Sequence, residues 1–380
     1  EISEMLAAMR FRDGIDISYA CSTRGEGGQN DIGTEAGPDL GALRTREMER
    51  ACDVLGMRMY WHGTHPEDTI TDFGFSKSGK ETLDRWGYNR TMQRFVDIVR
   101  EDRPDIICPT FLDVPGQHGH HRAMTEAAHA VMAAAAAPDF PCDRPPWQVK
   151  KLYLPAWSGA GQAYDDDLPP PPATLTVLGT DRELMTGWNW NRIGQQSRAY
   201  HRTQGMGRWV PTGPGQDWPL HLVESHAPKN PLPDPDVAIW SNLPKTLADI
   251  ATLPEAAAVA ADLASAQDAI DAAVTAFPNF THIADLAAKA ARHLQSAQGA
   301  CPPEHAHRLE AKLTQLGHVL CLALGVDARA RPLAPFVDAG SNLGIVMEID
   351  AGAAASAEGT LLLPNRWTAT NDGAFVASDA

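Results

Sequence analysis

The chain has 380 residues, of which 43% are hydrophobic and 21% charged, a composition typical of a soluble globular protein with two or three domains. Its formal net charge of -16, with no basic stretch to offset it, argues against nucleic acid as a partner. No apolar run reaches the roughly 20 residues of a membrane helix. The six dispersed cysteines form no Cys-x-x-Cys pair, so neither a thiolate zinc site nor a disulfide scaffold is indicated.

The first half of the chain alternates helical periodicity with short β-rich runs. Helices are predicted at residues 1–11, 40–55, 82–100, 123–137 and 191–203, and strands at 15–20, 57–61, 105–108, 150–154 and 174–178. This alternation predicts an α/β domain with a Rossmann-like, mostly parallel sheet and helices on both faces.

The composition changes after residue 207. We predict one domain over residues 1–207, a Pro-rich linker over 208–243, a helical region over 244–328, and a β-rich segment over 329–380 that forms the start of a β-sandwich. Residue 1 lies inside a helical pattern without a cap, and residue 380 lies inside a strand-like pattern. We therefore expect the chain to be a piece of a longer protein.

Three histidines lie between the strand predicted at 105–108 and the alanine-rich helix predicted at 123–137: His118, His120 and His121. The carboxyl end of a strand is where α/β enzymes present ligands and catalytic groups. A spacing of three places His118 and His121 on one face of a helical turn. One ring is then able to hold a metal while the other meets a substrate. The alternative is a solvated loop whose histidines share no function.

Five short motifs occur in a fixed order along residues 1–207. They are Thr23-Arg24-Gly25-Glu26-Gly27-Gly28-Gln29-Asn30, Arg44-x-x-Glu47, Asp72-Phe73-Gly74-Phe75, His118-Gly119-His120-His121 and Ser197-Arg198-x-x-His201-Arg202-x-Gln204-Gly205. Together they resemble the LmbE-like, or PIG-L, zinc-dependent N-deacetylases, and more specifically the long bacterial members with extra C-terminal domains. Each motif alone is a weak signal, and the combination is specific.

The resemblance implies Zn²⁺-dependent hydrolysis of the N-acetyl group of an N-acetylglucosamine-type sugar or glycoconjugate. The family has a His-x-x-His pair whose second histidine binds zinc and whose first faces the scissile carbonyl; these positions match His121 and His118, with His120 as the fallback ligand. The other ligands and the general base belong to a His-Pro-Asp-Asp block that would precede residue 1. We therefore expect the 380 residues alone to be inactive and to bind zinc weakly.

The glycine-rich motif after the first predicted strand lets backbone amides approach a ligand closely. We interpret Arg24, Glu26 and Asn30 in this motif as substrate-binding residues. Arg44 is a further substrate-binding candidate that would clamp a sugar hydroxyl or phosphate. The alternative for Arg44 is an ion pair with Glu47 on the surface of its helix.

A second histidine-rich stretch, His62-Gly63-Thr64-His65-Pro66-Glu67-Asp68, nearly copies the block that the resemblance requires. It follows the second predicted strand, where the family has no ligands. We therefore interpret it as a polar surface loop. Tight zinc binding by this chain would instead point to His62, His65 and Asp68 as ligands.

Two other functional classes have to be compared with the deacetylase. A carbohydrate-binding or scaffold protein would keep the fold without the chemistry, and an intact His-Pro-Asp-Asp block upstream would favour the enzyme over it. A nucleotide-binding Rossmann enzyme is disfavoured, because residues 23–30 do not form a Gly-x-Gly-x-x-Gly fingerprint leading into a helix. Long members of the family are often exported, so the resemblance favours a periplasmic or extracellular location.

Overall fold

The computed structural model describes residues 2–157, 168–228, 238–334, 337, 340–356, 358–360, 368 and 374–376. The chain divides into two compact units, Glu1–Leu243 and Pro244–Ala380. Within the described residues, no helix combines the length and the apolarity needed to cross a membrane.

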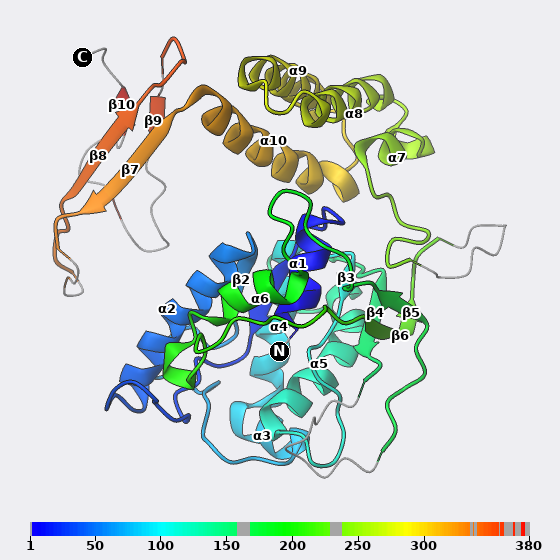
Figure 1. The fold of residues 1–380 in the computed structure, drawn as a ribbon. Helices are drawn as coiled ribbons and strands as arrows, with labels where there is room; N and C mark the ends of the chain where they lie inside the picture. The colour runs from blue at the N-terminus through cyan, green and yellow to red at the C-terminus, as the bar shows by residue number, and fades with distance from the viewer. Residues whose placement is uncertain are drawn as a thin grey trace. The chain divides into compact units, whose positions relative to one another are not determined.

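The first unit alternates helices with short strands, as Figure 1 shows. Its helices are α1 (Ser3–Phe11), α2 (Pro38–Val54), α3 (Gly79–Trp86), α4 (Tyr88–Asp102), α5 (Gly119–Ala136) and α6 (Trp190–Arg198), followed by a 3-10 turn at Arg202–Gln204. Its strands are β1 (Ser18–Cys21), β2 (Arg58–Trp61), β3 (Ile106–Ile107), β4 (Lys151–Pro155), β5 (Leu175–Val177) and β6 (Trp218–Ser225). The α/β class predicted from the sequence is confirmed.

These strands form two sheets. Strands β1 and β2 pair in parallel, and a four-stranded sheet has the order β3-β4-β6-β5. Strand β3 is parallel to β4, but β6 is antiparallel to both of its neighbours. The larger sheet is therefore mixed, and not mostly parallel as the sequence predicts. The difference arises because β6 lies within residues 208–243, which the composition predicts to be a linker.

Helices cover the four-stranded sheet on both faces, as predicted. Successive side chains of a strand point to opposite faces, and in β4 Leu152 packs with α4 and α5 whereas Tyr153 packs with α1, β5 and β6. The apolar side chains of α4 that form its buried face are Met92, Phe95, Val96 and Val99. Their spacing of three and four residues is that of a helix with one apolar face, and that face fixes α4 against the alanine-rich α5.

The single helix predicted over 82–100 is two helices in the structure. Gly87 separates α3 from α4 with φ at 83°, a backbone conformation that residues with a Cβ rarely adopt. Ser78 caps the start of α3, because its Oγ accepts a hydrogen bond from the Glu81 N–H at 3.1 Å. This cap ends the loop of residues 72–78, which contacts the histidine motif described below.

The second unit begins with helices, as the apolar spacing of residues 244–324 predicts. Helices α7 (Leu247–Ala251), α8 (Ala260–Thr275), α9 (Phe280–Gln298) and α10 (Pro303–Leu324) share one alanine- and leucine-rich core. Strands β7 (Asp327–Pro332) and β8 (Ile345–Asp350) pair antiparallel, as do β9 (Glu358–Thr360) and β10 (Ala374–Val376). The β-sandwich stays a prediction, since these are two separate pairs and part of the β-rich segment predicted over 329–380 lies outside the described residues.

Candidate active site

The histidine motif lies where α5 begins, directly against the loop of residues 72–78. His118 precedes the helix in an extended conformation, and the Gly119 N–H donates a hydrogen bond to the Ser76 carbonyl at 2.8 Å. A side chain at Gly119 would overlap Ser76, so the absence of a Cβ permits this close approach. Ser76 is itself buried and its hydroxyl lies 2.9 Å from the hydroxyl of Thr82 in α3. The start of α5 is therefore fixed by contacts from a segment about 40 residues earlier.

The structure brings the three histidine rings together. The ring centroids of His118 and His121 are 5.6 Å apart, and those of His118 and His120 are 4.8 Å apart. His118 and His121 are half-buried, whereas His120 is 5% exposed. The pair that the sequence predicts to act together therefore lies on the accessible side of the cluster, and His120 lies behind it.

His121 is held by one aromatic ring and one amide. Its ring stacks on Phe111 at 3.8 Å between centroids and 5° between planes. Its Nδ1 lies 3.0 Å from Gln117 Oε1, which also accepts the His118 N–H at 2.9 Å. Because an amide oxygen accepts only, this contact places the proton of neutral His121 on Nδ1 and leaves the lone pair on Nε2.

Burial, followed by the neighbouring His118 and His120, lowers the pKa of His121 to about 3. The ring is therefore neutral at pH 7, which is the form that binds a metal. A histidine whose Nδ1–H is held by an acceptor and whose Nε2 is free has the usual arrangement of a metal-ligating imidazole. His121 thus fits the role of one ligand of a zinc ion.

The rest of a zinc site is not found in the part of the chain that the structure describes, where no group of three or more His, Cys, Asp or Glu side chains is gathered for a metal. Zinc sites use three or four protein ligands. The described residues therefore provide one fitting ligand, and by themselves they do not complete the set.

His120 is placed differently from the other two histidines. Its ring lies 4.4 Å from the ring of Phe73 and 5.4 Å from that of Trp86. Its Nδ1 faces His118 Nδ1 at 3.0 Å, and its Nε2 lies 3.8 Å from Asp72 Oδ1. Burial lowers the pKa of His120 to about 4. Both ring nitrogens are directed at other side chains, so the geometry favours His121 over His120 as the metal ligand.

Arg24 and Glu26 lie in the glycine-rich loop after β1 and are both buried. The Arg24 guanidinium donates to Thr45 Oγ1 at 2.7 Å and to the carbonyls of Gly63 and Thr64, and it lies over the Trp61 ring. These contacts join the loops that follow β1 and β2, so Arg24 shapes this edge of the sheet.

Glu26 connects the same loop to the segment beside the histidines. Its Oε2 accepts the backbone N–H groups of Arg24 at 3.2 Å and Asp72 at 3.0 Å. Its Oε1 is buried and has no hydrogen-bond partner among the described residues. A buried acceptor without a partner is costly, so Oε1 is the atom of this carboxylate at which a further hydrogen bond would be stabilising.

Asn30 and Arg44 use their side chains within the protein. Asn30 Nδ2 donates to the carbonyl and the carboxylate of Glu35, and its Oδ1 accepts from Ile32 and Gly33. The predicted pair of Arg44 with Glu47 is not what the contacts show. Arg44 donates to the carbonyls of Gly25 and Gln29 and to the hydroxyl of Thr203. Both residues therefore hold the glycine-rich loop in shape.

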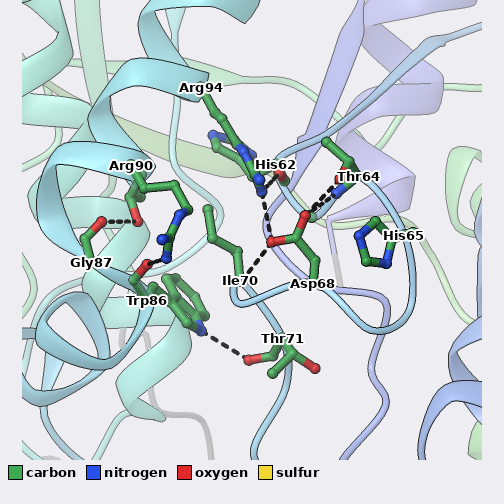
Figure 2. A network of polar contacts seen from close by, with 12 residues as sticks. His62, Thr64, His65, Asp68, Ile70, Thr71, Trp86, Gly87, Arg90 and Arg94 are labelled. Atoms are coloured by element: carbon green, nitrogen blue, oxygen red, sulfur yellow. Dashed lines mark hydrogen bonds and ion pairs between the residues drawn. The ribbon is translucent and has the colours of Figure 1, made fainter.

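The second histidine-rich stretch is a loop whose Thr64, His65 and Glu67 are exposed, as the sequence predicts, but its His62 and Asp68 are buried in a polar network. Figure 2 shows the Asp68 carboxylate between Thr64 and Arg94, with the His65 ring apart from that network. Asp68 accepts from the Thr64 N–H and hydroxyl, from the Ile70 N–H and from Arg94 at 2.6 to 3.0 Å. Burial opposes ionisation, but the bonds from Arg94 and Thr64 outweigh it and hold the pKa of Asp68 well below its usual range.

His62 belongs to the same network and is fully buried. Its ring meets Phe95 edge-on, and its Nδ1 lies 3.3 Å from the Cys21 carbonyl. Burial lowers the pKa of His62 to about 4. Because Asp68 already accepts four hydrogen bonds, the stretch ties the loop after β2 to α4 and does not present a free carboxylate to a metal.

Residues 2–132, which include His118 and His121, match the model of the PIG-L family, described as GlcNAc-PI de-N-acetylase. Two curated relatives are the 1D-myo-inositol 2-acetamido-2-deoxy-alpha-D-glucopyranoside deacetylases 1 of Frankia casuarinae and Frankia alni. The first is 34% identical over 128 residues, covering 31% of this chain and 40% of the relative. The second is 33% identical over 127 residues, covering 32% and 43%. The chain thus spans about two fifths of the length of the curated relatives it matches.

Two solved structures show weaker likenesses. A conserved protein from Thermus thermophilus is 17% identical with a TM-score of 0.36, over 55% of this chain and 74% of that protein. GalB, the 4-carboxy-2-hydroxymuconate hydratase of Pseudomonas putida, is 15% identical with a TM-score of 0.37, over 60% and 92%. The motifs in their order and the match of the family model agree, and both show that residues 2–132 are similar to the PIG-L (LmbE-like) family.

Proposed function

We propose that this domain serves the Zn²⁺-dependent hydrolysis of the N-acetyl group of an N-acetylglucosamine-type sugar or glycoconjugate. The observation that supports the proposal most strongly is the histidine pair. His118 and His121 fall inside the family match and have their rings 5.6 Å apart, on the accessible side of the cluster. Both curated relatives are named as deacetylases of an acetamido-deoxy-glucopyranoside of inositol.

In this proposal the two histidines have different tasks. His121 binds the metal through Nε2, because Gln117 Oε1 occupies its Nδ1–H. Bound zinc would lower the pKa of a water molecule to about 7 and polarise the amide carbonyl. His118 faces that carbonyl, where its protonated ring, an imidazolium, would stabilise the oxyanion and give a proton to the leaving amine.

For the substrate, we propose contact through Glu26 and a supporting role for the other residues of the predicted binding set. The buried Oε1 of Glu26 is the free acceptor described above. Arg24, Asn30 and Arg44 bind substrate in the sequence-based hypothesis, but their hydrogen bonds within the protein support an indirect role through the shape of the loop.

Acetate release from a panel of N-acetylglucosaminides, including a myo-inositol glycoside, tests the function in a protein that contains this domain together with a His-Pro-Asp-Asp block. The expected result is release that a chelator abolishes and zinc restores. Binding of the same sugars with no release under any metal would favour the non-catalytic carbohydrate-binding alternative. Neither binding nor release would refute both.

The chain of 380 residues should by itself bind zinc weakly and release no acetate. Its described residues provide one fitting ligand where zinc needs three or four. Equilibrium competition with a chelator measures the affinity. Stoichiometric, submicromolar binding would contradict this expectation and would return attention to His62, His65 and Asp68.

A further inference from the structure

A line of three side chains runs from Asp72 through His120 to His118. The Nδ1 atoms of His118 and His120 are 3.0 Å apart, and His120 Nε2 lies 3.8 Å from Asp72 Oδ1. Asp72 belongs to the loop before α3, whereas both histidines lie at the start of α5. The family match covers all three residues, and the sequence alone assigns no role to Asp72.

We propose that Asp72 and His120 are positioning residues that fix the tautomer of His118, so that its Nδ1 carries the proton and its Nε2 carries the lone pair toward the substrate. The inference rests on the proposed function for the purpose of that lone pair. The tautomer itself is a property of the protein without substrate.

The positions of the protons along this line follow from which atoms are able to donate a hydrogen bond. An ionised carboxylate only accepts hydrogen bonds, so the proton of neutral His120 is favoured on Nε2, which faces Asp72. His120 Nε2 has no hydrogen-bond partner among the described residues, and its nearest acidic group is this carboxylate. His120 Nδ1 is then an acceptor. Two nitrogens 3.0 Å apart share one proton, and that proton must come from His118 Nδ1.

The line is held in place at its acidic end. Asp72 Oδ1 accepts the Gly74 N–H at 2.8 Å, and the Asp72 N–H donates to Glu26 Oε2 at 3.0 Å. These bonds fix the carboxylate with one oxygen toward His120, in a site where His120 itself is 5% exposed. Electrostatic attraction between buried groups is stronger than between groups in water.

The packing around His120 keeps its ring from turning. Phe73 and Trp86 lie close to its ring on the side of α3, and Arg85 stacks on Phe73 at 4.5 Å. A ring that is enclosed in this way keeps Nδ1 directed at His118 and Nε2 at Asp72. The contacts therefore fix the orientation of the His120 ring and, with it, which of its nitrogens faces Asp72 and which faces His118.

The chosen tautomer matters for the proposed reaction. The attacking water loses a proton to the general base, and a His118 ring with its lone pair on Nε2 is able to receive that proton from the base. The imidazolium so formed stabilises the oxyanion and returns the proton from the same atom to the leaving amine. The opposite tautomer presents an N–H at Nε2 and is unable to accept that proton. Asp72 and His120 would thus prepare His118 for acid–base work without touching the substrate.

Two variants test the line, each with its packing preserved. His120→Phe keeps a ring between Phe73 and Trp86 but removes both nitrogens. Asp72→Asn keeps an oxygen for the Gly74 N–H but removes the charge. Asp113→Asn is the matched control, because Asp113 is also a carboxylate beside α5 but pairs with Arg122 at 2.6 Å. Circular dichroism and thermal unfolding confirm that each variant is folded.

The readout is the tautomer of His118 in the full 380-residue chain, from long-range ¹H–¹⁵N NMR spectra of histidine-labelled protein. The expected result is Nδ1–H for His118 and Nε2–H for His120. In His120→Phe the His118 signals should move toward the Nε2–H form, in Asp72→Asn they should move partly, and in the control they should stay. A wild-type His118 in the Nε2–H form, or no change in His120→Phe and Asp72→Asn, would overturn the proposal.

Activity gives an independent second readout in a metal-loaded protein that contains this domain. His120→Phe should lower kcat by ~10²-fold with little change in KM, as expected when general acid–base catalysis is impaired. A tautomer change with unaltered kcat would refute the positioning role. The expected tautomers in a protein that releases no acetate would instead refute the proposed function and leave the line itself intact.

Discussion

Replacing Gly119 by alanine should destabilise the first unit and disturb the histidine pair. A Cβ built on Gly119 overlaps the Ser76 hydroxyl and lies 2.8 Å from Ser76 Cβ and 2.9 Å from the Ser78 backbone nitrogen. Backbone atoms of a capped loop are unable to move aside as a flexible side chain does. Either α5 shifts away from the loop, or Ser76 rotates and loses its contact with Thr82 at 2.9 Å.

The magnitude follows from these two costs. Inserting a methyl group into a closely packed site costs about 1–3 kcal/mol, and losing the buried hydroxyl contact costs about 1 kcal/mol more. Alanine has a higher helix propensity than glycine, worth about 1 kcal/mol within a helix, but Gly119 is the first residue of α5, where the gain is smaller. We therefore expect a net loss of about 2–3 kcal/mol, from a typical total of about 5–15 kcal/mol.

Urea unfolding followed by tryptophan fluorescence is the appropriate assay, since nine of the ten tryptophans of the chain precede residue 244. Gly213→Ala is the control, because a Cβ at Gly213 meets no atom within 4 Å and its φ needs no glycine. This control should change stability by no more than about 0.5 kcal/mol. If Gly119→Ala were as stable as the control, the close packing of α5 on the Ser76 loop would be wrong.

Three further predictions follow from other contacts. In a metal-loaded protein that contains this domain, His121→Ala should lose zinc, whereas His118→Ala should keep zinc and lose turnover by about 10²-fold or more. Metal analysis that finds equal zinc loss in both variants would contradict the assignment. Arg94→Met should cost about 3 kcal/mol in urea unfolding, because it leaves the buried Asp68 carboxylate without its cation, and a loss below about 1 kcal/mol would contradict that account. The pKa of His62 falls to about 4 on folding from about 6.5 in the unfolded chain, so the unfolded state binds the proton more tightly and the free energy of unfolding should fall as pH drops from about 6.5 to 4. His62→Phe should reduce this dependence of the free energy of unfolding on pH. An unchanged dependence would count against a neutral buried His62.

The sequence predicts the elements that carry strong local signals. The alanine-rich pattern at 123–137 corresponds to α5, and the histidines before it lie at its start as expected. The break of one predicted helix at Gly87 was not visible, because a glycine is tolerated within many helices and only the backbone conformation shows that this one ends α3. Strand β6 was missed because its β-rich residues lie between proline- and glycine-rich stretches that indicate a linker.

The side-chain contacts of the site were less predictable than its location. Arg44 and Asn30 have the residue types of a sugar-binding loop, but their hydrogen bonds are determined by tertiary structure. Arg44 contacts Thr203, which is 159 residues away in the chain. Gln117 gave no signal of its own, since a glutamine before a histidine is common, and Asp72 belonged to one of the five motifs without an assigned role. Their importance depends on the 3.0 Å and 3.8 Å contacts that the fold creates with His121 and His120.

Two pairs of a histidine and an aspartate, His62 with Asp68 and His120 with Asp72, differ in the hydrogen bonds that the carboxylate already accepts. In the first, Asp68 accepts four hydrogen bonds, including one from Arg94. In the second, Asp72 Oδ1 accepts the Gly74 N–H and faces His120. A carboxylate that is saturated by its own loop stabilises the fold, whereas one that retains an approach to a histidine is able to influence proton position. The near-copy of the family's metal-binding block is therefore the structural group, and the less conspicuous aspartate lies behind the candidate active site.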